Sequence, residues 1–476
     1  MPGQGVKDRA VYRTLIGILC TLSSPSLLPG RAEVMASQTY LLRPERKAGD
    51  LVQVEVVLQA GGDLHLHNSN AVAGTPASIR TLPMTVAAKL VYDERTLGLR
   101  NDDKGSCRSV RYYQSAKALI EFEKTVQNLS LGEKQKLIAV DTTEAETTLV
   151  SLGKRISREE RDLVDGVGSS LILDEFLPRE PVPLGGVWKH SDNLLAALLR
   201  LDAVSLGDVQ SMLAEVHPQE NAAKISMAGT VHGAVGGVAT EIELKSKYTF
   251  DLSSKRITAF ALLVKEKRSI GHVGPGLDMV AKQIVKIRPL GVSDQLPDSV
   301  VPDAQRALDE SARLLLFESP HNRFRLDHDR RWFVTSDEKK LTVFRLVDRG
   351  ELVAQCNVAA LDPVPDGQAF GLADFQRDIE KSLGKKFSQF VSAKEETDSS
   401  DRRIYRVVAN GTVSDLSIQW LYYLYTTREG RRLSVAFTIE QGLVERFGRA
   451  DQQFLAHLEI APPQTATAGS PTPAQR

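Results

Sequence analysis

The sequence has few cysteines, no net charge and no long apolar run beyond its first residues, and each absence excludes a class of protein. Three cysteines among 476 residues are too few for a scaffold held by disulfides. Lysine and arginine together number 60, as do aspartate and glutamate, so no overall charge attracts the chain to nucleic acid or to an anionic membrane. What is present, 25% charged and 42% hydrophobic residues, is typical of a folded globular protein.

The first 36 residues have the order of a secretory signal peptide. A basic start at 7–13 precedes the uncharged run 14–30, and small residues follow. We therefore expect residues 1–36 to be removed and the protein to be exported, to the periplasm or the extracellular space. The run is near the lower length limit for a membrane span, so an uncleaved anchor is the alternative. After cleavage we expect no membrane span and a balance of 56 basic against 58 acidic residues.

The aromatic residues are spread unevenly along the chain. Of 28 Phe, Trp and Tyr, 17 lie between Phe317 and Phe454. A dense aromatic core after a sparser first part predicts two domains, joined where proline and glycine punctuate the chain. The predicted division is a signal peptide at 1–36, an N-terminal β-rich α+β domain at 37–290, a linker and connecting helix at 291–316, a C-terminal α+β domain at 317–461, and a disordered tail at 462–476.

The N-terminal domain is predicted to be mostly strands with a helical interlude. Alternating apolar residues predict a strand at 51–58, with a turn at Gly61-Gly62-Asp63. Ser157 and Glu160 have the spacing of a capping box, which marks the start of a helix. Further strands are predicted at 84–92, 109–113, 118–122, 137–140, 224–231, 240–250 and 256–265, and short helices at 194–201 and 209–216.

The C-terminal domain is predicted in the order βββ-α-βββ-α. The expected strands are 324–326, 341–346, 352–358, 403–408, 416–425 and 432–439, and the expected helices are 304–316, 372–390 and 443–458. Strands grouped apart from helices favour α+β with antiparallel sheets in both domains, each sheet packed with helices.

This order resembles the PsbP-like fold, in which helices cover both sides of an antiparallel sheet. The matching pieces are Phe324-Arg325-Leu326 before Trp332, the helix 372–390, the aromatic strand 416–425, and the strand 433–439 before the final helix. The resemblance covers 317–461 and implies a PsbP-like α/β/α sandwich. Asp327-His328-Asp329 stands where that family usually has a proline, and the fold implies no reaction.

The N-terminal domain resembles exported bacterial proteins of unknown function. The stretches that carry this resemblance are 181–188 and 247–251. The domain is also distantly similar to LolA-like envelope proteins, in which a curved sheet holds a lipophilic guest, although no binding residue can be matched. These resemblances imply that the protein is exported and has a binding role.

The sequence offers one pair of metal-ligand candidates. His65 and His67 are two residues apart, so on a strand both imidazoles face the same side, which is also the side of Asp63. No third or fourth ligand is evident nearby, and a solvated polar face opposite Leu64 and Leu66 explains the same pattern. We keep His65 and His67 as the metal candidates and expect no cofactor.

Three other features have structural explanations. In Asp327-His328-Asp329 adjacent residues of a strand would face opposite ways, so we predict a polar turn before Trp332. The glycine-rich stretch 229–237 precedes a strand pattern rather than a helix, and we predict a hairpin connection instead of a phosphate cradle. Cys107 and Cys356 fall in different predicted domains, and we expect buried or free thiols.

These observations favour an exported, non-catalytic binding or interaction protein of the bacterial cell envelope. Neither a Gly-x-Ser-x-Gly elbow nor a His-Glu-x-x-His pair occurs. The expected partner is an envelope protein or a lipophilic small molecule, and not nucleic acid. We expect a lipophilic ligand to lie between the N-terminal sheet and its helices. One alternative is an exported hydrolase or metal-dependent enzyme with a site gathered from His65, His67, His232 and His272. Another is a structural component of an envelope assembly.

Overall fold

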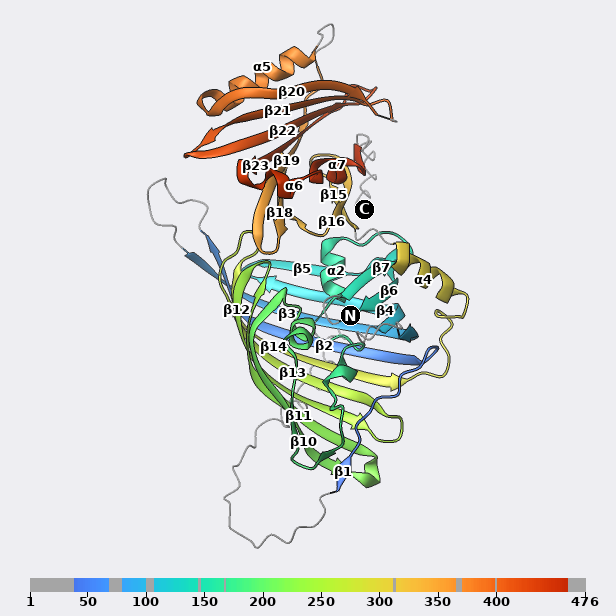
Figure 1. Cartoon of the computed structure of the whole chain (residues 1–476). Helices are drawn as coiled ribbons and strands as arrows, with labels where there is room; N and C mark the ends of the chain where they lie inside the picture. Colours follow the sequence, from blue (N-terminus) through green and yellow to red (C-terminus); the bar gives the residue numbers. More distant parts are fainter. Residues whose placement is uncertain are drawn as a thin grey trace, which may run out of the picture. The chain divides into compact units, whose positions relative to one another are not determined.

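The structure, a computed structural model, consists mainly of antiparallel β-sheets (Figure 1). It describes residues 38–67, 79–99, 107–143, 147–166, 168–310, 314–364, 370–398 and 400–460. The signal peptide predicted at 1–36 and the tail predicted at 462–476 therefore lie outside the described residues. Of the helices that are described, none is long and apolar enough to cross a membrane.

The largest sheet has twelve strands, all of which lie before residue 290. They are β2 (Leu51–His67), β3 (Ile79–Leu99), β4 (Cys107–Phe122), β5 (Thr125–Ser130), β6 (Leu137–Thr142), β7 (Thr147–Ser151), β9 (Val187–Lys189), β10 (Ala203–His217), β11 (Ala222–Val235), β12 (Val238–Asp251), β13 (Arg256–Arg268) and β14 (Gly276–Pro289). Eleven follow the path β7-β6-β4-β3-β2-β14-β13-β12-β11-β10-β9, and β5 pairs with β4. Two short strands, β1 (Thr39–Tyr40) and β8 (Val182–Pro183), pair separately.

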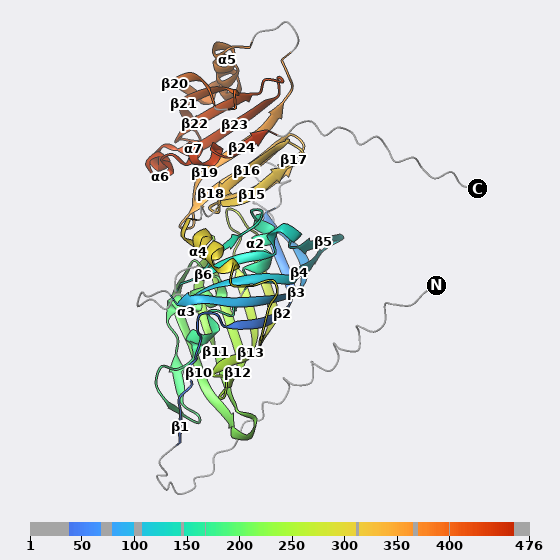
Figure 2. The same ribbon diagram turned by 90° about the vertical axis from the view of Figure 1, so that its right-hand side faces the viewer.

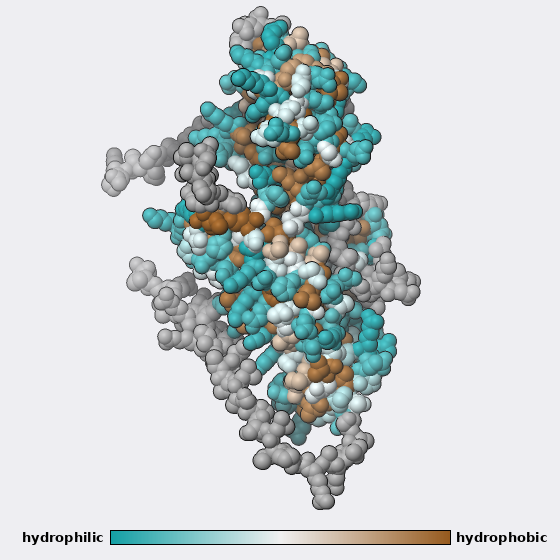
Figure 3. All heavy atoms as spheres, turned by 60° about the vertical axis from the view of Figure 1, so that its left-hand side comes forward, coloured by the Kyte–Doolittle hydropathy of each residue, from teal (hydrophilic) through white to brown (hydrophobic). Residues whose placement is uncertain are grey.

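Strict alternation of side chains gives this sheet two different faces. In β12 buried and exposed residues alternate from Ala239 to Tyr248, as the period of two in a strand requires. We call the inner face the one that carries Val54, Tyr92, Leu244 and other buried apolar side chains of one hydrophobic cluster. The opposite face is more polar. Figure 3 shows that, on the side in view, hydrophobic residues form small patches among hydrophilic ones.

The inner face is covered by the segment 156–201, which we call the cover. It holds α2 (Arg158–Val164), a 3₁₀ turn (Leu173–Phe176) and α3 (Asp192–Leu199). Leu163, Phe176 and Leu195 of the cover belong to the same hydrophobic cluster as the inner face. Figure 2 shows α2 and α3 lying against the sheet.

The predicted capping box begins α2, so this prediction is confirmed. The Ser157 hydroxyl accepts a hydrogen bond from the Glu160 amide at 3.2 Å, and the Glu160 carboxylate accepts one from the Ser157 amide at 2.9 Å. The helix ends at Val164, so it is only two turns long. Its last two residues, Leu163 and Val164, are buried against the sheet.

The turn predicted at Gly61-Gly62-Asp63 is wrong, because β2 runs through it to His67. Here glycine provides room instead of a turn. A Cβ atom on Gly62 would lie 2.1 Å from the Asp278 carbonyl oxygen and 2.6 Å from the Met279 Cα of β14. Glycine inside a strand often marks such a close approach of a neighbouring backbone.

The helix predicted at 209–216 is also wrong, since these residues belong to β10. Val209, Met212, Leu213 and Val216 have the three- and four-residue spacing of a helix, which explains the prediction. In the structure Val209 and Leu213 are buried, whereas Met212 is exposed. Pairing with β9 and β11 on both sides therefore overrides the local pattern.

The strands after residue 313 form two further sheets. The three-stranded sheet has the order β15 (Leu314–Ser319), β16 (Phe324–Asp329), β24 (Leu458–Ile460). The seven-stranded sheet has the order β17 (Trp332–Glu338), β18 (Leu341–Asp348), β19 (Glu351–Leu361), β23 (Arg432–Glu440), β22 (Leu416–Thr426), β21 (Arg403–Val413), β20 (Phe387–Thr397). The remaining helices are α4 (Val300–Glu310), α5 (Leu372–Leu383), α6 (Val444–Phe447) and α7 (Ala450–Leu455).

Apolar side chains lie on both faces of the seven-stranded sheet. Phe375 of α5 clusters with Tyr405 and Leu424, while Phe454 of α7 belongs to a second cluster with Tyr423. Neighbouring residues of β22 thus enter different clusters, as the predicted alternation in 416–425 requires.

Several predicted helices in this part are too long. The helix predicted at 304–316 ends at Glu310, and that predicted at 372–390 ends at Leu383. The helix predicted at 443–458 is divided into α6 and α7, and β24 follows. At Gly384 and Gly448 the backbone has φ of +52° and +55°, a conformation that favours glycine and stops a helix. Besides β10, the strands β1, β5, β7, β8, β9, β14, β15, β17, β20 and β24 of the described chain were not predicted.

The close approach of the β14 backbone leaves no room for a side chain at Gly62. Gly62→Ala should destabilise the protein by about 1–3 kcal/mol, because the new methyl group meets the β14 backbone, which cannot move aside without breaking the ladder. Gly61→Ala is the matched control, since its Cβ would have nothing nearer than the Met84 carbonyl oxygen at 3.9 Å. Urea unfolding of both variants measures the difference. Equal losses at the two positions would show that Gly62 is not needed for close strand approach.

Candidate functional site

The inner face of the twelve-stranded sheet is only partly covered, and the uncovered part forms a cavity. On β2, Val52 and Val54 are 5% and 0% exposed, but Val56 and Leu58 farther along the same face are only half-buried. The same change occurs on β3, between buried Leu90 and half-buried Ala88. The cover therefore buries one end of these strands fully, and the apolar side chains of the next stretch pack against the same cluster but stay half-buried.

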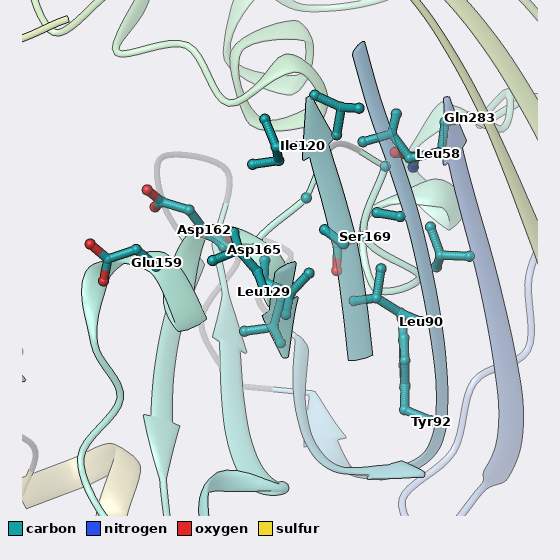
Figure 4. A pocket seen from close by; sticks show the side chains of 18 of the residues that line it. Leu58, Leu90, Tyr92, Ile120, Leu129, Glu159, Asp162, Asp165, Ser169 and Gln283 are labelled. Atoms are coloured by element: carbon teal, nitrogen blue, oxygen red, sulfur yellow. The ribbon is translucent and has the colours of Figure 1, made fainter. Parts of the chain in front are cut away.

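This cavity has a volume of about 340 Å³, a size at the lower end of ligand pockets. It lies between α2 and the inner face of β2 to β5 and β14 (Figure 4). Its walls are mainly aliphatic and include Val56, Leu58, Val86, Ile120, Leu129 and Leu163.

Small residues make the space. Ala88 and Ala118 are directly opposite each other in the β3–β4 ladder, and both line the cavity. Gly166 and Gly168, just after α2, line it as well. Because an Ala–Ala cross-strand pair projects only methyl groups from the sheet, the inner face is hollow where longer side chains would fill it.

The cavity ends at a buried polar network. Its lining there includes Tyr92, Arg111 and Ser169. The Arg111 guanidinium donates to the Glu94 carboxylate at 2.7 Å and to the Ser169 hydroxyl at 2.8 Å, and it lies 4.8 Å from the centre of the Tyr92 ring. The deep end of an otherwise apolar cavity therefore presents hydrogen-bonding groups.

The network behind this end is electrically balanced. Arg46 reaches Glu94 at 3.5 Å and Asp174 at 2.9 Å, so two guanidinium groups face two carboxylates. Ser170 of the cover adds a hydroxyl 2.9 Å from Glu94. These contacts join the residues before β2, strands β3 and β4, and the cover, and so they fix the cover on the sheet.

The charges of this network stay ionised although they are buried. Burial alone would raise the pKa of the Glu94 carboxyl, but Arg111 and Arg46 outweigh it and hold that pKa below its ordinary value. Burial raises the pKa of Tyr92, which donates or accepts at the Ser170 hydroxyl over 3.2 Å. A carboxylate fixed between two guanidinium groups has no proton to offer, so the network is suited to positioning rather than to acid–base chemistry.

The two metal candidates, His65 and His67, lie on the same strand. His65 and His67 both lie in β2, as the strand prediction requires, and the His65 imidazole contacts the Thr81 hydroxyl at 3.2 Å. Over the described residues, no group of three or more His, Cys, Asp and Glu side chains is placed to hold a metal ion. The side chain of His67 lies outside the description, so metal binding by this pair stays a prediction.

The other predicted histidines lie apart. His232 is on β11, and β12, β13 and β14 separate that strand from β2. His272 lies in the connection between β13 and β14. The glycine-rich stretch 229–237 is the β11–β12 hairpin, as predicted, with positive φ at Gly236 and Gly237.

Asp327-His328-Asp329 is not a turn, contrary to the prediction. It belongs to β16, where His328 is 1% exposed, next to the rings of Phe344 and Phe454. Alternation along the strand places it on the same face as buried Phe324 and Leu326. Its Nδ1 donates to the Asp329 carbonyl at 2.9 Å.

Both cysteines of the described chain are buried free thiols, as predicted. Burial raises the pKa of Cys107 to about 11 and that of Cys356 as well, so neither is a thiolate at neutral pH.

No sequence pattern identified the cavity residues in advance. Ala88 and Ala118 fall in predicted strands, 84–92 and 118–122, but nothing showed that these strands would be neighbours. The one available signal was on β3, where apolar residues alternate from Leu82 to Tyr92. This apolar stretch extends beyond the part of the strand that the cover buries.

Removing the central carboxylate tests the buried network. Glu94→Gln should lower the free energy of unfolding by about 3–5 kcal/mol, because it leaves the guanidinium groups of Arg46 and Arg111 without their shared anion. The control is Glu123→Gln, which breaks an exposed pair with Arg80 and should leave the urea midpoint nearly unchanged. A small effect at Glu94 would show that the network does not hold the cover.

Because His328 is buried, we predict that the folded protein loses stability in acid. Burial lowers its pKa to about 4, below the ordinary value of 6.5, so between these values the unfolded chain binds a proton that the folded chain does not. Stability should therefore fall as pH decreases from 6.5 to 4, by about 3 kcal/mol from this residue. His328→Asn keeps an N–H donor without the titration and should lose less stability over that range, while His190 remains in both proteins. Parallel pH profiles would contradict the assignment.

Comparisons with known proteins give a distant likeness of fold. No protein-family model matches the chain, and no curated protein matches it. Cyanobacterial PsbP from Synechocystis sp. PCC 6803 is similar over 31% of this chain and 92% of its own, with 14% identity and a TM-score of 0.25. The Ran-binding protein Mog1p of Saccharomyces cerevisiae is similar over 32% and 96%, with 8% identity and a TM-score of 0.26. DynF from the dynemicin biosynthesis pathway of Micromonospora chersina covers 58% and 96%, with 9% identity and a TM-score of 0.15.

With TM-scores of 0.25 and 0.26, the PsbP and Mog1p matches carry no conclusion about the PsbP-like fold predicted for 317–461. The LolA-like resemblance predicted for the N-terminal domain receives no support from the comparisons. Likenesses at this level say nothing about activity, ligand or partner.

Proposed function

We propose that this protein binds a lipophilic small molecule in the cavity of the twelve-stranded sheet and carries out no reaction there. The observation that carries the proposal is the set of half-buried aliphatic side chains, Val56, Leu58, Val86 and Ile120, around the cavity. Apolar side chains on a sheet face are stabilised when they are removed from water. An apolar ligand would bury these side chains as the cover buries the rest of the inner face.

The absence of a reactive arrangement around this cavity supports binding over catalysis. Its lining residues in the described chain include neither histidine nor cysteine. Arg111 is bound to Glu94, and Asp165 accepts from Arg161 at 2.7 Å and also pairs with Arg200. These charges are engaged in structural pairs. The alternative, a hydrolase or metal-dependent enzyme built from distant histidines, has no comparable geometry behind it.

The division of the chain into domains is also a proposal. We infer that the twelve-stranded sheet with its cover, and the sheets after residue 313, are two α+β domains, the second a PsbP-like α/β/α sandwich. In its support, the buried cluster around Phe437 draws, within the described chain, only on residues from Phe317 onward. The signal-peptide pattern of 1–36 motivates the further proposal that binding takes place in the bacterial cell envelope.

Filling the cavity from the protein side tests this function. Purified protein should bind the uncharged fluorescent probe N-phenyl-1-naphthylamine, and 1-decanol should displace it. Ala88→Trp should weaken probe binding at least about tenfold, because the indole occupies the cavity that the apolar probe needs. Fluorescence titration measures both affinities.

The matched control is Ala87→Trp. Ala87 is the preceding residue of β3 and is exposed on the opposite face of the sheet, so its indole should leave probe binding unchanged. Thermal unfolding of both variants establishes that each is folded. Equal loss of binding in both, or no binding by the unchanged protein, would contradict the proposed function.

A further inference from the structure

We propose that the cavity accepts uncharged lipophiles, such as fatty alcohols or esters, and excludes fatty carboxylates. This inference rests on the proposed function and adds the class of ligand to it. It follows from the charges at the two ends of the cavity, a balanced network at the deep end and two carboxylates at the open end.

The deep end has no net positive charge to offer an anion. Arg111 is the only cation that lines the cavity among the described residues, and its guanidinium is held by buried Glu94 at 2.7 Å. Arg46 and Asp174 complete the network, so two positive groups meet two negative ones. A ligand carboxylate placed here would be buried without a counter-charge, which is costly in an apolar surrounding.

The same end is nevertheless able to bind a neutral polar group. The Ser169 hydroxyl lines the cavity and accepts a hydrogen bond from Arg111 at 2.8 Å. A hydroxyl has one proton to donate in addition to its acceptor positions. With its oxygen engaged by Arg111, the Ser169 proton is directed to another acceptor, and an alcohol or ester oxygen is an uncharged acceptor of this kind.

The open end is acidic. Glu159 and Asp162 of α2 line the cavity and are exposed to solvent, and Figure 4 shows their carboxylates on the α2 edge, apart from Tyr92 and Ser169. Arg161 makes its shorter contact, 2.7 Å, with Asp165 and stands 3.5 Å from Asp162. An anion that enters past these two carboxylates meets like charge.

The closing experiment compares ligands that share one chain and differ in charge. Displacement of N-phenyl-1-naphthylamine is measured with 1-decanol, decanoate and decyltrimethylammonium at about pH 8, where a carboxylic acid is ionised. We expect decanol to bind at least about tenfold more tightly than decanoate. Equal or tighter binding of decanoate, or tighter binding of decyltrimethylammonium than of decanol, would overturn the inference while the proposed function stands. No displacement by any of the three would remove the proposed function itself.

Two variants locate the selectivity. Glu159→Gln combined with Asp162→Asn should tighten decanoate binding and leave decanol binding unchanged, because both changes remove charge at the opening without altering its shape. Ser169→Ala should weaken decanol about three- to tenfold through loss of one hydrogen bond. If neither variant alters the decanol-to-decanoate ratio, the two ends of the cavity do not set the preference and the inference is wrong.

Discussion

The constraint on which the N-terminal part depends is the mismatch between a long apolar sheet face and a short cover. Strands of 14 to 21 residues carry inward apolar side chains along most of their length. The cover has helices of only seven and eight residues, and it buries one end of β2 and β3. The remainder of the inner face must either contact solvent or be covered by another molecule. The cavity is the direct consequence, and its small residues Ala88 and Ala118 keep it open.

The buried ionic network explains why the cover does not slide to fill this space. Ion pairs in the interior contribute little net stability, because desolvation offsets the attraction between the charges. They do require specific geometry. Ser170 reaches Glu94, and Asp174 reaches Arg46, only when the cover occupies one position on the sheet. The network thus fixes the boundary between the covered and uncovered parts of the inner face.

Much of the strand content could be predicted from the sequence, because alternation within one strand is a local property. The runs 240–250 and 416–425 are examples. Where a short apolar run fits both periods, as at 209–216, local pattern cannot decide, and pairing with distant strands does. The capping box at Ser157 was found because its two partners are three residues apart. The cavity was not, since Ala88 faces Ala118 only through the β3–β4 ladder, and Arg46 meets Asp174 across 128 positions of the chain.

A cavity of this kind must be explained by more than incomplete packing. Protein interiors are close-packed, and an apolar face left without neighbours forgoes both dispersion contacts and the removal of its surface from water. Burying a ligand there would recover that free energy, and binding to the folded state alone would stabilise the protein in proportion to the logarithm of ligand concentration. Apolar walls alone would bind any lipophilic molecule of suitable size. The neutral network at one end and the carboxylates of Glu159 and Asp162 at the other impose a choice, because each raises the free energy of a bound anion without affecting an uncharged chain. In the proposed function, binding and selectivity would thus arise from separate residues, the first from the sheet and the second from the cover and the network beneath it.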